Sequence, residues 1–325
     1  MTCWALLAFA CAAMIGCGDR RAPGKLRMGL MPKLIGISYF KASETGAREA
    51  AAELGVELDY DGPTVDSAEE QVKMIDRWIA QGHDIIAVAA NDPELVAPAL
   101  RRAHQAGITV LTWDADANAK ASERETFVNQ APVAEIGATL VDVLGEGVGG
   151  VGKTVIVTGS ATSPNQNAWI EAMQARIAEK YPQLELLETL VSDEDQAKAY
   201  RLTRDVINAH PDLKGIWGIT SVSLPGAAKA VRDAGKSGQI FVTGLSLPNT
   251  MRSYMTDGTV EKFVLWSPVD VGYLTVHVGK LLRDKKLAPG QQTIGRLNDI
   301  RVTSGEVLLG PPMIFDAKNI DAYDF

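Results

Sequence analysis

The chain has 325 residues, of which 46% are hydrophobic, so it is long and apolar enough for one large or two medium domains. Its net charge is −8, and no cluster of basic residues interrupts the acidic balance. This composition excludes a nucleic-acid-binding protein. All three cysteines lie within the first 17 residues. The body of the chain therefore offers no disulfide, no thiol nucleophile and no cysteine metal site.

An apolar segment opens the chain and predicts export. Residues 4–15 are too few for a membrane-spanning anchor, and they are followed by Gly16-Cys17, a small residue before a cysteine that resembles a bacterial lipobox. We expect residues 1–17 to be a lipoprotein signal peptide, with Cys17 acylated after cleavage, and residues 18–25 to be a polar tether. The first three residues lack the usual Lys or Arg, and a leader for soluble secretion is the alternative.

Strands and helices then alternate along the first half of the body. Ser67 and Glu70 form a capping box at a helix start, and Gly55 and Gly82 follow helix ends. The continuous apolar run 85–89 is typical of a strand buried on both faces. The predicted elements are strands over 26–31, 56–60, 85–89 and 110–113, and helices over 39–54, 67–81 and 95–106.

The same alternation restarts in the second half. The glycine-rich segment 145–152 follows a helix and precedes a strand, the wrong order for a dinucleotide-binding loop, so we predict a surface loop. Residues 288–325 are predicted to be loop-rich with short strands such as 300–302. Two runs of strand–helix units predict an α/β fold of two doubly wound parallel-sheet lobes. The predicted elements are helices over 133–144, 165–180, 195–209, 225–234, 248–257 and 270–283, and strands over 154–157, 184–190, 215–219, 240–243 and 260–266.

Polar side chains concentrate where strands end. Residues 162–169, Thr-Ser-Pro-Asn-Gln-Asn-Ala-Trp, follow a strand and open a helix, which places them at the sheet edge where α/β folds bind ligands. Their amides and hydroxyls can pair with many oxygens, and the indole of Trp169 suits the C–H face of a sugar ring. Asp114 ends another strand, and its carboxylate can accept two hydroxyls at once. The pattern predicts polyol binding rather than catalysis.

Several motifs, in this order and spacing, resemble periplasmic sugar-binding proteins of the ribose-binding type (type I). They are similar in particular to the rhamnose-binding and autoinducer-2-binding branch, and the resemblance covers residues 26–325. The matching stretches are Pro32-Lys33, Tyr39-Phe40, Ala89-Ala90-Asn91-Asp92-Pro93, Leu111-Thr112-Trp113-Asp114, Asn165-Gln166-Asn167-Ala168-Trp169, Thr243-Gly244-Leu245-Ser246-Leu247-Pro248, Leu265-Trp266-Ser267-Pro268 and the chain end from Asn319 to Phe325.

The resemblance implies two lobes joined by three crossovers that close on a monosaccharide. It places residues 26–129 and 268–292 in the N-terminal lobe, and residues 130–267 and 293–325 in the C-terminal lobe. It also implies a monomer in the periplasm or cell envelope that delivers its ligand to an ABC permease and touches the membrane only through its lipid. We expect no cofactor and no metal, because the four histidines show no metal-ligand spacing.

The resemblance also assigns ligand contacts. It implies that Lys33, Asn165 and Gln166 contact ligand oxygens, and that Pro225 and Ala227 occupy small, backbone-contacting positions. The autoinducer-2 pattern has an aspartate where this chain has Asn165, whereas the rhamnose pattern reads Asn-Gln-Asn as here, so we expect a deoxy-hexose. Further candidates at corners, strand ends and the first crossover are Tyr39, Phe40, Asn91, Asp92, Asn129, Ser246 and Trp266.

Several of these candidates can also be explained by a purely structural role. Tyr39 and Phe40 can form an aromatic wall or part of the core, and Asp92 before a proline can be a helix cap instead of a ligand contact. Pro225 can simply start a helix, and Ala227 can simply pack well. Asn129 can serve the hinge, the ligand or both.

Three other functions remain open at this point. An enzyme on a similar fold would show turnover of candidate sugars, although no nucleophile elbow or metal cluster is present in the sequence. A sugar-responsive transcription regulator would need an N-terminal DNA-binding motif where this chain has an export leader. A sensor that signals to a membrane receptor would share the binding site with a transporter.

Overall fold

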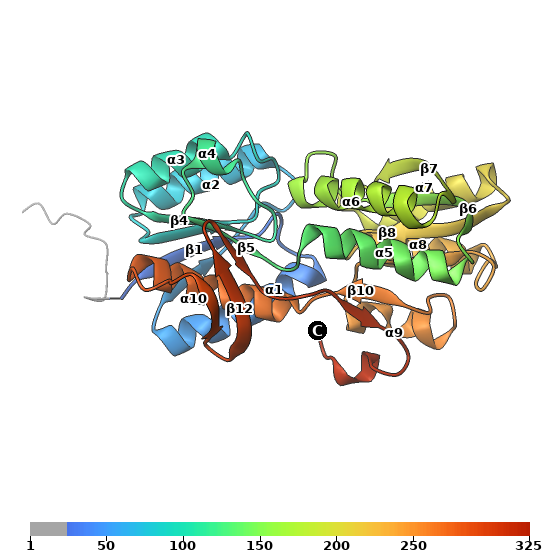
Figure 1. Cartoon of the computed structure of the whole chain (residues 1–325). Helices are drawn as coiled ribbons and strands as arrows, with labels where there is room; N and C mark the ends of the chain where they lie inside the picture. The colour runs from blue at the N-terminus through green and yellow to red at the C-terminus, as the bar shows by residue number, and fades with distance from the viewer. Residues whose placement is uncertain (1–24) are drawn as a thin grey trace, which may run out of the picture.

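The computed structural model describes residues 25–325, which form two lobes connected side by side (Figure 1). The predicted leader, its Cys17 and nearly all of the tether lie outside the described residues. Within residues 25–325, no helix combines the length and the apolar character that crossing a bilayer requires.

The first lobe is built on an eight-stranded sheet with the order β11-β12-β13-β5-β4-β3-β1-β2. Strands β1 to β5 and β13 run parallel, and β11 and β12 extend the sheet as an antiparallel hairpin. Its strands are β1 (Arg27–Met31), β2 (Glu57–Tyr60), β3 (Ile85–Val88), β4 (Thr109–Trp113), β5 (Thr126–Asn129), β11 (Gly290–Ile294), β12 (Leu297–Thr303) and β13 (Glu306–Leu308).

Helices cover both faces of this sheet, as a doubly wound fold requires. Helices α1 (Ser38–Leu54) and α10 (Pro268–Arg283) pack together below the sheet in Figure 1. Helices α2 (Ala68–Ala80), α3 (Ala97–Gln105) and the short α4 (Ala119–Ser122) lie above it. The Ser67 hydroxyl caps α2 by accepting from the Glu70 amide at 3.2 Å, which confirms the predicted helix start.

The second lobe repeats the strand order of the first. Its strands follow the order β7-β6-β8-β9, and β10 continues the sheet through a single parallel bridge between Leu245 and Val264. The sequence β7-β6-β8-β9-β10 therefore corresponds to β2-β1-β3-β4-β5, and antiparallel β14 completes the edge. The strands are β6 (Val151–Thr158), β7 (Gln183–Val191), β8 (Leu213–Gly218), β9 (Phe241–Gly244), β10 (Phe263–Leu265) and β14 (Met313–Phe315).

Five α-helices and one 3₁₀ turn surround the strands of this lobe within the described residues. Helices α5 and α6 pack against each other, as do α7 and α8. Their bounds are α5 (Val133–Gly147), α6 (Pro164–Lys180), α7 (Gln196–Ala209), α8 (Ser223–Asp233), α9 (Pro248–Thr256) and η1 (Ile320–Ala322).

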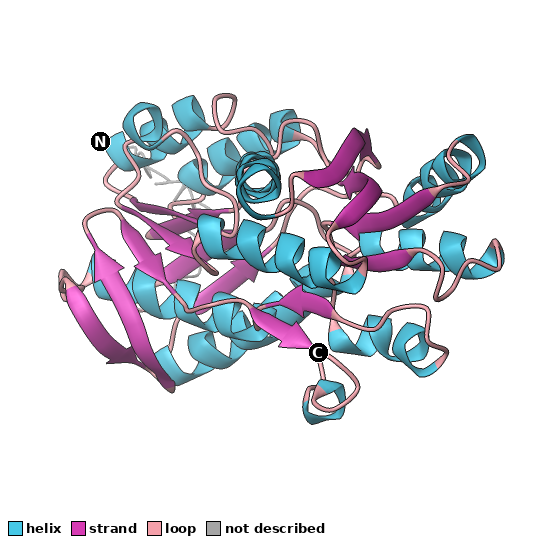
Figure 2. Cartoon of the chain, turned by 45° about the vertical axis from the view of Figure 1, so that its right-hand side comes forward, coloured by secondary structure: helices cyan, strands magenta, loops and turns pink. Residues whose placement is uncertain are grey.

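Three segments connect the lobes (Figure 2). Residues 130–132 join β5 to α5, residues 266–267 join β10 to α10, and residues 309–312 join β13 to β14. Three adjacent connections restrain twisting and still permit bending, so the two lobes can hinge about this side of the molecule.

The third connection falls later in the chain than the sequence predicts. Residues 293–308 were assigned to the C-terminal lobe, but β11, β12 and β13 belong to the sheet of the first lobe. The reason is the parallel pairing of β13 with β5, in which Val307 lies opposite Val128. The Arg124 guanidinium strengthens this pairing by donating to the carbonyl oxygen of Gly305 at 2.8 Å.

The glycine-rich segment 145–152 is also not the loop that the sequence predicts. Helix α5 extends to Gly147, and β6 begins at Val151. A Cβ on Gly145 would lie 2.6 Å from the Tyr181 ring, and one on Gly147 would lie 2.3 Å from the Phe241 ring. These glycines therefore allow aromatic side chains to pack directly on the helix backbone.

Two buried tryptophans make hydrogen bonds that anchor one strand in each lobe. The indole of Trp113, at the end of β4, donates to the carbonyl oxygen of Met31 at the end of β1, across 3.0 Å. The indole of Trp217 in β8 donates to the carbonyl oxygen of Leu140 at 2.8 Å. A buried indole N–H needs such a partner. The Trp113 bond also brings the residues that follow β1 and β4 close together.

Candidate functional site

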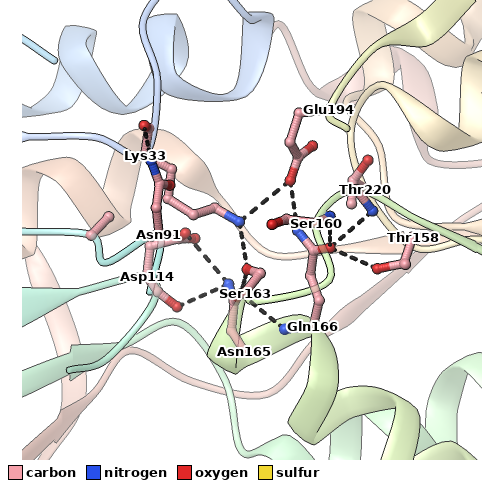
Figure 3. A network of polar contacts seen from close by, with 12 residues as sticks. Lys33, Asn91, Asp114, Thr158, Ser160, Ser163, Asn165, Gln166, Glu194 and Thr220 are labelled. Carbon is pink, nitrogen blue, oxygen red and sulfur yellow. Dashed lines mark hydrogen bonds and ion pairs between the residues drawn. The ribbon is translucent and has the colours of Figure 1, made fainter. Parts of the chain in front are cut away.

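A cavity lies between the lobes, at the carboxyl ends of parallel strands from both sheets. Residues after β1 and β4 approach it from the first lobe, and residues after β6, β7 and β8 approach it from the second (Figure 3). This is where doubly wound folds bind ligands. The lining residues are Lys33, Ile37, Tyr39, Phe40, Asp114, Asn165, Gln166, Trp169, Glu194, Ile219, Thr220, Ser221, Leu245, Leu265 and Trp266.

Asp114 lies at the first-lobe wall of this cavity and is 3% exposed. Its Oδ1 accepts a 2.7 Å hydrogen bond from the Tyr39 hydroxyl, and the Asn165 amide donates to its backbone oxygen at 3.2 Å and to Oδ2 at 3.5 Å. Burial raises the pKa of Asp114 to about 6, against the opposing effects of the Lys33 charge and the Tyr39 hydrogen bond. The carboxylate is therefore ionised at neutral pH but poorly solvated.

Lys33 reaches across the cleft from the first lobe to the second (Figure 3). Its ammonium donates to the Ser163 hydroxyl at 2.9 Å and lies 3.4 Å from Oε1 of Glu194. The two side chains of this ion pair are 6% and 4% exposed. A buried charge without a partner is strongly unfavourable, so Lys33 and Glu194 depend on one another.

Gln166 is held by the backbone at the end of β6. Its amide oxygen accepts from the Thr158 hydroxyl at 2.7 Å and from the backbone amides of Gly159 and Ser160 at 2.9 and 3.0 Å. Its amide nitrogen donates to Oε1 of Glu194 at 2.6 Å. These contacts saturate the oxygen and fix the orientation of the amide, so Gln166 can offer a ligand only its second N–H.

Aromatic rings form the apolar wall of the cavity. The Tyr39 ring makes edge contacts with Phe40 and Trp266, with ring centroids 5.1 and 6.4 Å apart. Trp169 of the second lobe lies 5.6 Å from Trp266. The Trp266 indole donates to the Tyr39 hydroxyl at 2.8 Å, and burial raises the pKa of Tyr39. The wall thus presents ring faces together with oriented polar atoms.

Asn91 and Asp92, which follow β3, do not line the cavity. The Asn91 side chain donates to the backbone oxygen of Lys33 at 2.9 Å, and its own backbone oxygen accepts from the Thr162 hydroxyl of the second lobe at 3.1 Å. Asp92 Oδ1 accepts from the backbone amides of Glu94 and Leu95, both at 2.9 Å. Asn91 therefore supports Lys33, and Asp92 acts as the cap of the following turn.

Four other predicted residues also lie outside the lining. Asn129 donates to Glu306 at 2.8 Å and so ties the first crossover to β13. Pro225 and Ala227 are buried within α8, and the Ser246 hydroxyl donates to the backbone oxygen of Ser221 at 3.2 Å. At this corner Thr220 and Ser221, which precede α8, line the cavity instead.

The sequence analysis missed Glu194 altogether. Two consecutive acidic residues, Asp193 and Glu194, follow β7, and such a pattern is typical of an exposed turn. Only the folded structure shows that the Glu194 side chain points inward and is buried. Thr220 and Ser221 could have been predicted from the sequence, because two hydroxyl residues closely follow the buried strand β8. Within the described residues, no group of three or more His, Cys, Asp or Glu residues could hold a metal ion.

The arrangement suits a small molecule with many hydroxyl groups. Charged and amide groups from opposite lobes can pair with its oxygens, and the aromatic wall can cover its C–H face. Several of the polar groups are paired across the cleft. The pairs that join Lys33 to Ser163, Asp114 to Asn165, and Asn91 to Thr162 show that the lobes are closed on each other.

Comparison with known proteins agrees with this architecture. Residues 28–287 match the family described as "Periplasmic binding protein domain". The ribose import binding protein RbsB of Escherichia coli is 24% identical over 269 residues, which are 82% of this chain and 88% of that protein.

Two solved structures resemble the whole two-lobed body. A solute-binding protein of an ABC transporter from Clostridium phytofermentas, with bound L-rhamnose, has a TM-score of 0.86 and 29% identity, covering 92% of this chain and 98% of that one. LsrB from Clostridium saccharobutylicum, in complex with AI-2, has a TM-score of 0.87 and 26% identity, covering 92% and 100%. The chain belongs to the periplasmic binding protein family, and within it to the ribose type.

Proposed function

We propose that this protein is the binding component of an ABC sugar importer and takes up a monosaccharide in the cleft between its lobes. The observation that carries the proposal is the convergence of Asp114, Lys33 and Asn165 from two lobes beside an aromatic wall. The relatives named above are binding proteins, which favours capture over turnover. Such a protein works in the periplasm or cell envelope, next to an inner-membrane permease.

Binding of the sugar would replace hydrogen bonds that now join the two lobes. Ligand hydroxyls can donate to Asp114 and accept from Lys33 and Asn165, whose present partners lie across the cleft. Leaving one such buried group unpaired costs about 1–3 kcal/mol, so a sugar with a misplaced hydroxyl is rejected. Lobe opening about the three crossovers lets the sugar enter, and closure excludes water.

We favour a rhamnose-like deoxy-hexose as the ligand because of Asn165. Its amide nitrogen faces Asp114 at 3.2–3.5 Å, where a carboxylate would face another buried carboxylate. The amide of Asn165 can also accept a hydrogen bond, and its Oδ1 already accepts one from the Ser163 hydroxyl at 2.7 Å. The apolar wall of Tyr39, Trp169 and Trp266 would accommodate the methyl group of a deoxy-sugar. Autoinducer-2 is the alternative ligand, supported by the similarity to LsrB.

A thermal-shift screen tests the proposal, because a ligand that binds only the folded protein raises its unfolding temperature. The probes are pentoses, hexoses, deoxy-hexoses and autoinducer-2, and calorimetry follows for each one that stabilises. We expect stabilisation by a deoxy-hexose and no chemical change of the sugar. A protein that none of these compounds stabilises would contradict the proposal, and turnover of a sugar would point to an enzyme. A role in sensing rather than transport predicts the same binding but no loss of uptake when the gene is deleted.

We also propose that Cys17 carries a lipid anchor. The support is the sequence Gly16-Cys17 after an apolar segment and the absence of any cysteine from residues 18–325. The wild-type protein should partition with membranes, and C17S should be released or remain unprocessed. A wild-type protein that is soluble and begins at another residue would instead indicate a leader for simple secretion.

A further inference from the structure

Glu194 enters the cleft from an unusual stretch of backbone. Asp193 and Glu194 both adopt left-handed conformations, with φ of 54° and 53°. For a residue other than glycine this conformation is strained. Such backbone persists where the surrounding structure holds it, and it concentrates at functional sites. Here the Glu194 amide donates to the carbonyl oxygen of Gly159 at 3.2 Å, and the side chain is 4% exposed.

Gly159 provides the space that the Glu194 carboxylate occupies. A Cβ on Gly159 would lie 2.2 Å from Oε1 and 2.5 Å from Oε2 of Glu194. Any other residue at the end of β6 would therefore push the carboxylate away from its place. The left-handed turn and the glycine, 35 positions apart in the chain, combine to hold one buried carboxylate against the cavity.

The carboxylate controls two other groups of the site. Its Oε1 accepts from the Gln166 amide at 2.6 Å and lies 3.4 Å from the Lys33 ammonium. Lys33, Asp114 and Glu194 are the charged residues of the described cavity lining. Two carboxylates face one ammonium, so the cleft carries an excess of negative charge when both are ionised.

We propose that Glu194 is a specificity-determining residue, which positions Lys33 and Gln166 and makes the cleft accept uncharged polyols while excluding sugars that carry a carboxylate or phosphate. This inference rests on the proposed function, since it concerns the same cleft. Without Glu194, Lys33 would be a buried cation free to pair with an anionic ligand. With Glu194 in place, a second anion would meet like charge in a desolvated site, which disfavours its binding.

The test compares neutral sugars with anionic counterparts. The probes are L-rhamnose, D-ribose and D-galactose, paired with L-rhamnonate, D-ribose 5-phosphate and D-galacturonate, and affinities are measured by calorimetry. E194Q removes the charge with little change of shape. D193N is the matched control, because Asp193 is the neighbouring residue and its side chain is 67% exposed. G159A displaces the Glu194 carboxylate but keeps its charge, and ligand-free thermal unfolding checks that each variant is folded.

We expect the wild type and D193N to bind at least one neutral sugar and to reject its anionic counterpart. In E194Q the preference for the neutral member of that pair should fall by at least about tenfold, equivalent to 1.4 kcal/mol. G159A should weaken binding of the neutral sugar without any gain for the anion. If E194Q and G159A are folded and keep the wild-type preference, the assignment of Glu194 is wrong while the proposed function stands. Tight binding of an anionic probe by the wild type also overturns the assignment, whereas a wild type that binds no sugar contradicts the proposed function itself.

Discussion

The indole of Trp266 donates a 2.8 Å hydrogen bond to the hydroxyl of Tyr39, 227 positions earlier in the chain. Trp266 is the first residue of the second crossover, and Tyr39 lies in the first turn of α1 in the N-terminal lobe. The Tyr39 hydroxyl in turn donates a hydrogen bond to Oδ1 of Asp114 at 2.7 Å. A chain of two hydrogen bonds therefore joins the hinge to the carboxylate that we expect to meet the ligand.

Replacing Trp266 by phenylalanine tests this connection. W266F keeps an aromatic ring but removes the donor that orients the Tyr39 hydroxyl. We expect sugar affinity measured by calorimetry to fall by about two- to tenfold, the equivalent of one lost hydrogen bond. W217F is the matched control, because it also removes an indole donor, here to Leu140, but lies away from the cavity. W217F should lower the unfolding temperature without changing affinity; equal affinity losses in both variants would contradict a specific role for Trp266.

The sequence predicted most of the fold because the signals were local. A capping serine such as Ser67, a buried apolar run such as 85–89 and a glycine after a helix each depend on a few neighbouring residues. The four-residue elements β5 and α4 were missed. The strands β11 to β13 join the first lobe through β5, more than 150 residues earlier. No local pattern specifies such a partner, so residues 293–308 were placed in the wrong lobe.

The same distinction applies to the site. Lys33, Asp114, Asn165 and Gln166 were predicted because each closely follows a strand or opens a helix after one, and the structure places all four in the cavity lining; their contact with a ligand stays a prediction. Glu194 was missed because its burial depends on a left-handed turn and on Gly159, which only the folded chain brings together. Pro225 and Ala227 came from resemblance alone, and the cavity wall at that corner is formed by the residues just before them.

Asp114 should be indispensable for sugar binding. Because its φ is 59°, a conformation that asparagine tolerates well, D114N preserves the backbone where alanine would be strained. D114N replaces the charged double acceptor by a neutral amide, and D114A removes it. We expect both variants to lose measurable binding in calorimetry, while D114N unfolds at a temperature no lower than that of the wild type. Unchanged affinity in D114N would remove Asp114 from the site.

The raised pKa of Asp114 also predicts how stability depends on pH. Its pKa is about 6 in the folded protein against an ordinary value of 3.8. The folded state thus holds the proton more tightly than the unfolded chain. The contribution of Asp114 to stability is fully present below pH 3.8 and is lost as the pH rises through about 6. It amounts to at most about 3 kcal/mol, since one pKa unit is 1.36 kcal/mol.

The measurement is the free energy of unfolding of the ligand-free wild type relative to D114N, by urea titration at several pH values. The free energy of unfolding of the wild type should rise relative to that of D114N as the pH falls from 7 to 4. Sugar affinity should move the opposite way and weaken below pH 6, because ligand hydroxyls need an ionised acceptor. A stability difference that stays constant over this pH range would show that the environment of Asp114 does not perturb its titration.

The choice between a deoxy-hexose and autoinducer-2 depends on residue 165. In the wild type the Asn165 amide donates toward Asp114 at 3.2 and 3.5 Å, so the two lobes attract one another at this point. N165D would place a second buried carboxylate where the Asn165 amide nitrogen now lies 3.5 Å from Oδ2 of Asp114, which raises the pKa of one carboxylate and opposes closure. It would also remove the amide N–H donors that residue 165 offers to a ligand oxygen. We therefore expect the wild type to bind L-rhamnose more tightly than autoinducer-2, and N165D to lose most of its affinity for L-rhamnose.

N167D is the matched control, because Asn167 is exposed on the same helix and its amide donates to the backbone oxygen of Ala161. A competition titration decides the matter: if the wild type binds autoinducer-2 more tightly than any deoxy-hexose, or if N165D retains its affinity for L-rhamnose, Asn165 does not set the preference.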